Sequence, residues 1–217
     1  MEISFASGTN FYKLFWVFFI GCFMGVVTET IWCVIKLHRF ESRKGLIYGP
    51  FNLVYGLGAL MMTLVLRVIS DKRDLVIFLS GALLGGIYEY ICSLFQEKFF
   101  GSISWDYKKF PFNLNGRINL LYCFFWGLLT LLWIKDIYPK ISYLVEKIPN
   151  AYGKPITWLL LLFMILNTVI SALAVYRKGD RLKGIPPKNS FWVFIDRKYP
   201  DEKITKIYPN MTFFTEK

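Results

Sequence analysis

Two glutamates inside long apolar stretches are the strongest candidates for chemistry in this sequence. Each follows two glycines at intervals of four residues, namely Gly21 and Gly25 before Glu29, and Gly81 and Gly85 before Glu89. A carboxylate exposed to hydrocarbon costs several kcal/mol, so each must face protein or water. There it could bind a ligand, act as an acid or base, or form a structural hydrogen bond with a tyrosine, asparagine or arginine.

Polar residues of the neighbouring segments are expected at the same depth as these glutamates. They are Tyr48, Asn52, Tyr55, Arg117 and Asn119. Gly49-Pro50 lacks one backbone donor and predicts a kink near the start of the second apolar stretch. Together with Glu29 and Glu89, the five residues predict a ligand-binding pocket open to the cytoplasm. Arg117 could instead reach the anionic headgroups of the membrane.

A loop rich in aromatic residues, 96–117, is expected beside this pocket. Its candidate residues are Trp105, Asp106, Tyr107 and Asn113. Aromatic rings that alternate with lysine and proline suit the headgroup zone, where irregular backbone can still reach water. The loop therefore predicts either a half-buried lid over the pocket or an interfacial linker without a ligand.

The elements that must position these residues are transmembrane helices. Of the 217 residues, 55% are hydrophobic and 19% are charged, with a net charge of +11. The apolar residues gather into five stretches long enough to cross a bilayer. They span roughly 11–35, 46–68, 75–95, 118–134 and 156–176. The composition predicts an all-α integral membrane protein and argues against a soluble enzyme, a disordered chain or a disulfide-stapled secreted domain.

The basic residues predict an orientation and a partner. Of the 26 lysines and arginines, 18 follow the first, third and fifth apolar stretches and eight lie in the other connecting segments. This distribution predicts an N-terminus outside and a C-terminus in the cytoplasm. Because no nucleic-acid-binding motif accompanies the charge, membrane lipids are the expected partner. The four cysteines show no metal-ligand spacing, so neither a metal nor a cofactor is predicted.

An internal repeat underlies the pattern of glycines and glutamates. The first and third stretches match at a constant offset of 60 residues, and the second and fourth match at an offset of 71, where Tyr55-Gly56 corresponds to Trp126-Gly127. Because the matched stretches enter the membrane from the same side, they predict a parallel repeat of two helical hairpins, 11–68 and 75–134. The predicted domains are a repeat-containing membrane domain (1–135), a linker with the fifth helix (136–176) and a basic cytoplasmic tail (177–217).

Several motifs together carry a resemblance to a known family. They are Tyr48-Gly49-Pro50, Trp105-Asp106-Tyr107, Pro111-Phe112-Asn113, Gly116-Arg117-Ile118-Asn119-Leu120 and Trp126-Gly127, after a glycine-rich helix that bears Glu29. Over about residues 12–135 the chain resembles the bacterial family labelled "putative ABC-transporter type IV", a permease-like group. The resemblance implies a multi-pass protein of the bacterial cytoplasmic membrane. Lys108 stands where members of that family tend to have serine.

Three functions are compatible with these features. The first is a permease-like transport component, which is favoured by repeated hairpins with polar residues on their shared axis. Because the chain contains no P-loop, ATP coupling would require a separate ATPase subunit, and few spans per chain favour a homo-oligomer. The second is a non-catalytic assembly or lipid-binding regulatory protein. The third is an intramembrane lipid-modifying enzyme, which no nucleophile motif supports.

Overall fold

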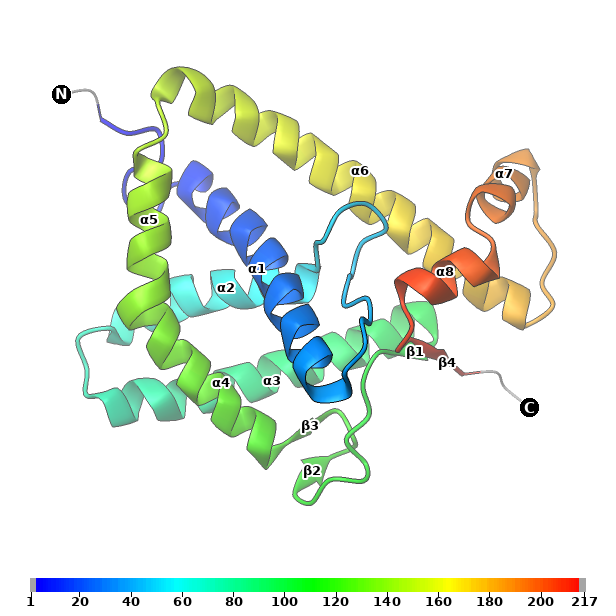
Figure 1. Cartoon of the computed structure of the whole chain (residues 1–217), viewed down its shortest axis with the longest axis horizontal. Coiled ribbons are helices and arrows are strands. Elements are labelled where there is room, and N and C mark those ends of the chain that lie inside the picture. Colours follow the sequence, from blue (N-terminus) through cyan, green and yellow to red (C-terminus); the bar gives the residue numbers. More distant parts are fainter. Residues whose placement is uncertain (1–2, 215–217) are drawn as a thin grey trace.

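The structure is a computed structural model that describes residues 3–214, without the side chains of Leu66 and Arg67. It is mostly helical, with two small two-stranded sheets (Figure 1). The helices are α1 (Phe11–Leu37), α2 (Leu53–Leu66), η1 (Arg67–Ile69), α3 (Asp74–Phe100), α4 (Leu120–Leu132), η2 (Trp133–Ile137), α5 (Tyr138–Glu146), α6 (Asn150–Leu182), α7 (Ser190–Lys198) and α8 (Asp201–Ile207). The strands are β1 (Ser102–Ile103), β2 (Asn113–Leu114), β3 (Ile118–Asn119) and β4 (Thr212–Phe213).

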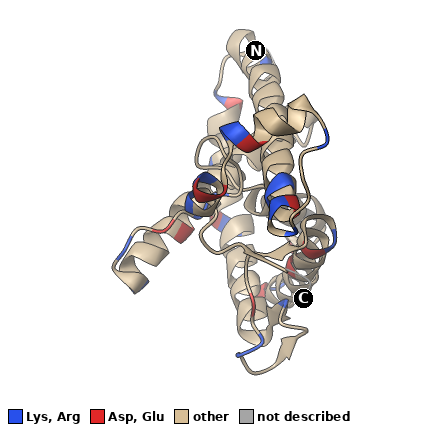
Figure 2. Ribbon diagram, turned by 90° about the vertical axis from the view of Figure 1, so that its right-hand side faces the viewer, with Lys and Arg blue, Asp and Glu red and all other residues tan. Residues whose placement is uncertain are grey.

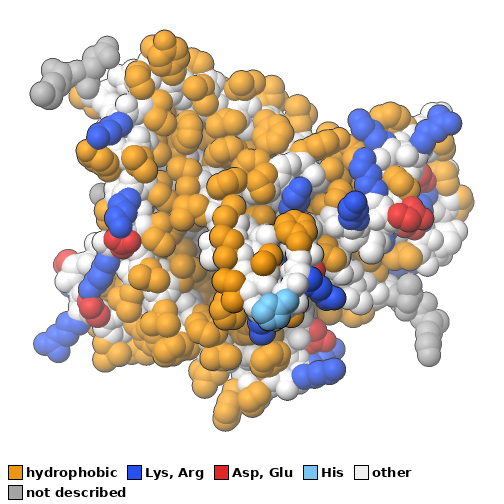
Figure 3. Space-filling view, viewed as in Figure 1, with side chains coloured by type: hydrophobic (Ala, Val, Ile, Leu, Met, Phe, Trp, Pro, Cys, Tyr) orange, Lys and Arg blue, Asp and Glu red, His pale blue; other side chains and the backbone are white. Residues whose placement is uncertain are grey.

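Four helical segments are long and apolar enough to cross a membrane. They are Phe11–Leu37, Asp74–Phe100, Leu120–Glu146 and Asn150–Leu182. In the space-filling view a broad apolar surface lies between two margins that carry lysines and arginines (Figure 3). This distribution suits a protein whose middle faces hydrocarbon and whose two ends face headgroups and water.

The second predicted stretch, 46–68, does not form a full-length span. Its helix α2 begins only at Leu53 and has 14 residues, which rise about 21 Å and do not cover a hydrocarbon core of about 30 Å. The preceding residues form a closed turn, in which the backbone N–H groups of Gly45 and Leu46 both donate to the Phe51 carbonyl at 2.9 and 3.0 Å. Gly49 has φ +70°, a conformation that a helix excludes. The expected kinked helix is therefore a turn followed by a short helix.

Glycines set the close approach within two pairs of helices. A Cβ atom on Gly25 of α1 would collide with the ring of Tyr55 of α2, and one on Gly85 of α3 would collide with the indole of Trp126 of α4. The α1–α2 and α3–α4 pairs thus pack through small residues, as membrane helices commonly do. Tyr88 of α3 links the two pairs by donating its hydroxyl to the Val54 carbonyl at 2.6 Å.

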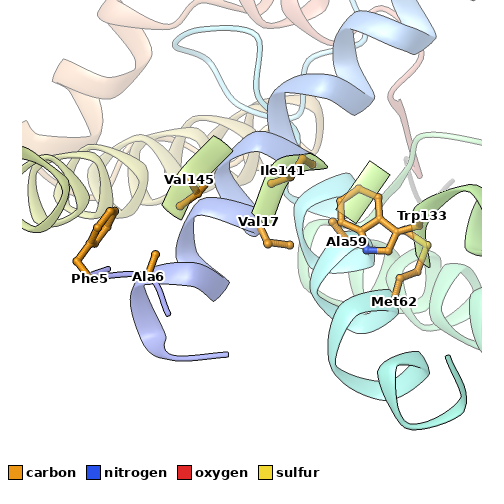
Figure 4. Packing of buried hydrophobic residues seen from close by; sticks show 8 residues of the cluster. All are labelled: Phe5, Ala6, Val17, Ala59, Met62, Trp133, Ile141 and Val145. Atoms are coloured by element: carbon orange, nitrogen blue, oxygen red, sulfur yellow. The ribbon is translucent and has the colours of Figure 1, made fainter. Parts of the chain in front are cut away.

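The fourth predicted stretch, 118–134, continues as helix well beyond its expected end. Between α4 and α5 the five residues of η2 adopt π-helical pairing, in which the Tyr138 N–H donates to the Trp133 carbonyl. Pro139, which has no N–H, follows directly. At this point the chain changes direction (Figure 1). As a result α5 packs on α1 and η2 packs on α2, where the largest apolar cluster lies (Figure 4). Its buried members are Phe5, Ala6, Val17, Ala59, Met62, Trp133, Ile141 and Val145.

The C-terminal segment folds onto the end of α6. Its helices α7 and α8 form an apolar cluster with that end, and β4 pairs with β1 in antiparallel fashion. The cluster consists of Ile47, Ala174, Val175, Ile195, Tyr199, Ile204 and Tyr208. We call the side of the molecule that carries residues 38–52, 101–119 and 183–214 the tail side. Figure 2 views the molecule from this side and shows basic and acidic segments interspersed on it.

Candidate functional site

Glu89 of α3 accepts hydrogen bonds from two neutral donors. Tyr107 Oη donates to Oε1 at 2.8 Å, and Trp126 Nε1 donates to Oε2 at 2.7 Å. Glu89 is only 8% exposed, and none of the described residues forms an ion pair with it. A buried carboxylate ion without a counter-charge is costly, so the surroundings of Glu89 are unfavourable for its charged form.

Tyr107 holds Glu89 from the loop between α3 and α4. Its ring stacks on Tyr122 of α4 with centroids 4.4 Å apart, which fixes the direction of the hydroxyl. Burial raises the pKa of Tyr107 above its ordinary value, and the nearby charge of Glu89 raises it further. The hydroxyl therefore stays protonated and available as a donor.

Glu29 of α1 has a different set of partners. Tyr55 of α2 donates a short hydrogen bond to its carboxylate, and Arg43 Nη1 lies 3.5 Å from Oε1. The side chain of Glu29 is 33% exposed, whereas Glu89, counted with its backbone, is 8% exposed. The charges of Glu29 and Glu89 are close enough to repel each other. The two glutamates thus form one acidic cluster, in which only Glu29 has a basic partner among the described residues.

Arg117 does not pair with either of these glutamates, contrary to one of the two expectations. It lies between β2 and β3 rather than on a helix, and its Nη2 atom is 2.6 Å from Oε2 of Glu97. Its Nη1 atom also donates to Ser93 Oγ at 3.3 Å. The hairpin carries the arginine past Glu89 to the tail-side end of α3. The signal was present in the sequence, because Glu89, Ser93 and Glu97 recur every four residues and share one face of α3.

The other predicted site residues mostly stabilise turns and helix ends. Asn119 caps α4 by accepting from the Tyr122 N–H at 2.9 Å, and Asn52 accepts from the Val54 N–H at 3.0 Å. Tyr48 Oη is 2.8 Å from Tyr199 Oη of the C-terminal segment. In the loop, three residues hold the backbone: Trp105 donates to the Arg117 carbonyl, Asp106 accepts from the Lys108 N–H, and Asn113 accepts from the Gly116 N–H.

The structure therefore divides the predicted pocket into two groups. Glu29, Glu89, Tyr55 and Tyr107 form the acidic cluster, while Arg117, Trp105 and Asp106 line a separate cavity of about 30 Å³. That volume is far below the roughly 300–1,000 Å³ of typical small-molecule sites. Arg43, Glu97 and Trp126 complete these groups but were absent from the predicted site. Arg43 and Trp126 are distant from their glutamates in sequence, so no local spacing pointed to them.

The position of Arg117 sets the expected cost of removing it. We expect Arg117→Ala to lower the free energy of unfolding by about 1–2 kcal/mol, which is below the cost of breaking a fully buried pair, because Glu97 is 38% exposed and water can solvate it afterwards. Thermal unfolding in detergent measures this. Lys108→Ala is the control, since Lys108 is 71% exposed. A loss above about 3 kcal/mol would instead indicate a buried, uncompensated charge.

Among the described residues, no group of three or more His, Cys, Asp and Glu side chains could hold a metal ion.

The comparisons with known proteins identify the family. No curated protein and no solved structure matches the chain. The model of the family described as "Putative ABC-transporter type IV" matches residues 16–172, more than half of the chain and a range that contains the whole acidic cluster. With its four long apolar helices, the chain is a multi-pass membrane protein and belongs to the family described as "Putative ABC-transporter type IV".

Proposed function

We propose that the chain is the permease-like membrane component of a transport system and that its acidic cluster binds a cationic group. The observation that carries the proposal is Glu89, whose two carboxylate oxygens accept, among the described residues, only from the neutral donors Tyr107 and Trp126. A buried carboxylate ion needs a compensating positive charge, which a cationic cargo or a proton would supply. Glu29 is more exposed and partly balanced by Arg43, so it lies on the approach from the tail side.

The proposal includes two copies of one helical hairpin. The contact of Gly25 with Tyr55 corresponds to that of Gly85 with Trp126, at the offsets of 60 and 71 residues seen in the sequence. The hydrogen bonds follow the same rule, because Tyr55 donates to Glu29 as Trp126 donates to Glu89. Equivalent contacts at equivalent positions support a duplicated hairpin that places one carboxylate in each copy.

The proposed topology has five crossings, with the N-terminus outside and the tail in the cytoplasm. The two ends of the described chain lie on opposite sides of the molecule, which an odd number of crossings requires (Figure 1). The short helix α2 then supplies the remaining crossing together with the turn before it, whose Ile47 and Tyr48 N–H groups donate to Ser171 and Asn167 of α6. The excess of lysine and arginine on the tail side supports a tail that lies on the cytoplasmic side of the cytoplasmic membrane.

The family supports an ATPase partner for this membrane component. The sequence has no P-loop, so a separate subunit would hydrolyse ATP. Membrane lipids surround the apolar surface, and a homo-oligomer remains part of the proposal because one chain has few crossings. We expect the transported substrate to be a cation, because the proposed binding site is the acidic cluster.

Replacing Glu89 with glutamine tests the proposal with little change to the fold. The amide oxygen can accept from Trp126, and the amide nitrogen can donate to Tyr107 Oη, since a hydroxyl both donates and accepts. We expect the purified wild type to be stabilised by at least one of sodium, potassium, magnesium or spermidine, by about 2.7 kcal/mol at a concentration 100-fold above Kd. Glu89→Gln should retain its basal stability and lose this response in thermal unfolding.

The matched control is Glu97→Gln, which removes a carboxylate from the same face of α3 but outside the acidic cluster. In thermal unfolding, Glu97→Gln should keep the wild-type response to the cation. Liposomes that contain the wild-type protein should take up the cation that stabilises it. An equal response in wild type and Glu89→Gln would contradict cation binding at Glu89. If neither responds at any pH, Glu89 is a structural group and the transport role must rest on other residues.

A further inference from the structure

Helix α7 exposes an apolar face that no part of the described chain covers. Phe191, Val193 and Phe194 are 50%, 52% and 54% exposed, whereas Ile195 on the other face is buried in the cluster of the C-terminal segment. Leu182 and Ile185 in the preceding segment are also exposed, at 43% and 40%. Exposed apolar side chains beyond the apolar stretch of α6 are unfavourable in water and mark a contact with another phase or molecule.

The contact between Tyr176 and Trp192 fixes the level of this surface. Tyr176 is the last residue of the apolar stretch of α6, directly before the basic residue Arg177. Its ring lies 6.0 Å from that of Trp192 on α7, measured between centroids. Tyrosine and tryptophan concentrate at the boundary between hydrocarbon and headgroups. Helix α7 therefore lies at the level at which α6 leaves the membrane.

Basic side chains surround the apolar face. Lys183, Lys188, Arg197 and Lys198 are all exposed, and none of the four belongs to an ion pair among the described residues. The one acidic residue between positions 183 and 198 is Asp196, which turns inward and binds Arg177 and Arg181. Lys198 Nζ lies 5.4 Å from the ring centroid of Phe194. The outward surface thus combines aromatic rings with uncompensated positive charge, as helices lying in a membrane interface do.

We propose that α7 and the segment before it form a binding surface for the anionic headgroups of the bilayer in which the chain is embedded. Lys188, Arg197 and Lys198 bind the lipid phosphates, while Phe191 and Phe194 enter the boundary between headgroups and acyl chains. Charge complementarity and the level set by Tyr176 favour this occupant over a protein partner. The surface is independent of the acidic cluster.

An environment-sensitive fluorophore on Phe194→Cys tests the proposal in the full chain, with the partly accessible Cys92 and Cys123 replaced by alanine. The protein is placed in bilayers of phosphatidylcholine alone or with added phosphatidylglycerol. We expect a blue-shifted emission that strengthens with phosphatidylglycerol and weakens with salt. Each basic side chain should contribute about five-fold to the equilibrium between the bound and released segment. The triple variant Lys188→Gln, Arg197→Gln, Lys198→Gln should therefore lose the phosphatidylglycerol response.

A matched triple variant, Lys72→Gln, Lys140→Gln, Lys147→Gln, removes the same charge from exposed positions elsewhere and should keep the response. Inorganic phosphate without anionic lipid should not produce the shift, which distinguishes a headgroup surface from a site for a free anion. A fluorophore that stays in water in every bilayer would overturn the proposal and assign the surface to a protein partner. An undiminished response in the first triple variant would also overturn it.

Discussion

Arg177→Ala is expected to lower the free energy of unfolding by about 3 kcal/mol, at the lower end of the cost of breaking a buried pair, because Arg177 is buried whereas Asp180 and Asp196 are only partly buried. Arg177 is 2% exposed, and its Nε and Nη2 atoms each lie 2.9 Å from an oxygen of Asp196. Its Nη1 atom contacts Asp180 at 3.2 Å and the Ile185 carbonyl at 3.1 Å. One guanidinium thus joins the end of α6 to α7 and to the segment between them.

The charge state of Asp196 supports this size of effect. Burial alone would raise the pKa of Asp196, but hydrogen bonds from Arg177 and Arg181 outweigh it and hold the pKa below its ordinary value. Without Arg177 the carboxylate keeps Arg181 as a charged partner but loses its bidentate one, so its charged form is less well stabilised. This loss weakens the attachment of α7 to α6.

Limited proteolysis and thermal unfolding in detergent measure the effect of Arg177→Ala. We expect rapid cleavage within residues 183–189 and a lower unfolding temperature. Arg197→Ala removes an exposed arginine from the same region and should change neither. Wild-type resistance to protease in Arg177→Ala would show that the apolar cluster alone holds the C-terminal segment.

The sequence was sufficient to predict the features that depend on local spacing. Glycines and a glutamate at intervals of four residues share one helix face in any helix, and Gly25 and Gly85 do lie at helix contacts. Four of the five predicted spans form long apolar helices, and the family also agrees with the sequence. The length of α2 was not predictable from hydropathy, because residues 46–52 are apolar enough for a span but close a turn around Phe51.

Contacts between distant segments account for the remaining differences. The partner of Arg117 depends on the hairpin of β2 and β3, which directs the side chain toward Glu97 instead of Glu89. Arg177 and Asp196 are 19 residues apart, and no periodicity connects them. Such pairs form only after α7 has packed on α6. The sequence alone places Arg177 and Asp196 in a basic tail, because hydropathy does not detect the apolar cluster that α7 and α8 form with α6.

Leucine in place of Gly25 or Gly85 is expected to destabilise the chain by about 3 kcal/mol or more in each case, at the upper end of the cost of overpacking. The added side chain would enter the space of Tyr55 in the first variant and of Trp126 in the second. Neither aromatic residue can move freely, because each donates a hydrogen bond to the glutamate four residues further along the glycine-bearing helix. Each substitution therefore separates two helices and also breaks one contact of the acidic cluster.

The pair of variants also tests whether the two hairpins are equivalent. Similar losses in thermal unfolding, with loss of the cation response in both, would support duplicated hairpins with one carboxylate each. Met24→Leu and Ile87→Leu are the controls, since these exposed neighbours face away from the helix contacts and should tolerate leucine. A large loss in only one glycine variant would argue against equivalence. Near wild-type stability in both would contradict the close approach of the helices, and with it the geometry that brings Tyr55 and Trp126 to their glutamates.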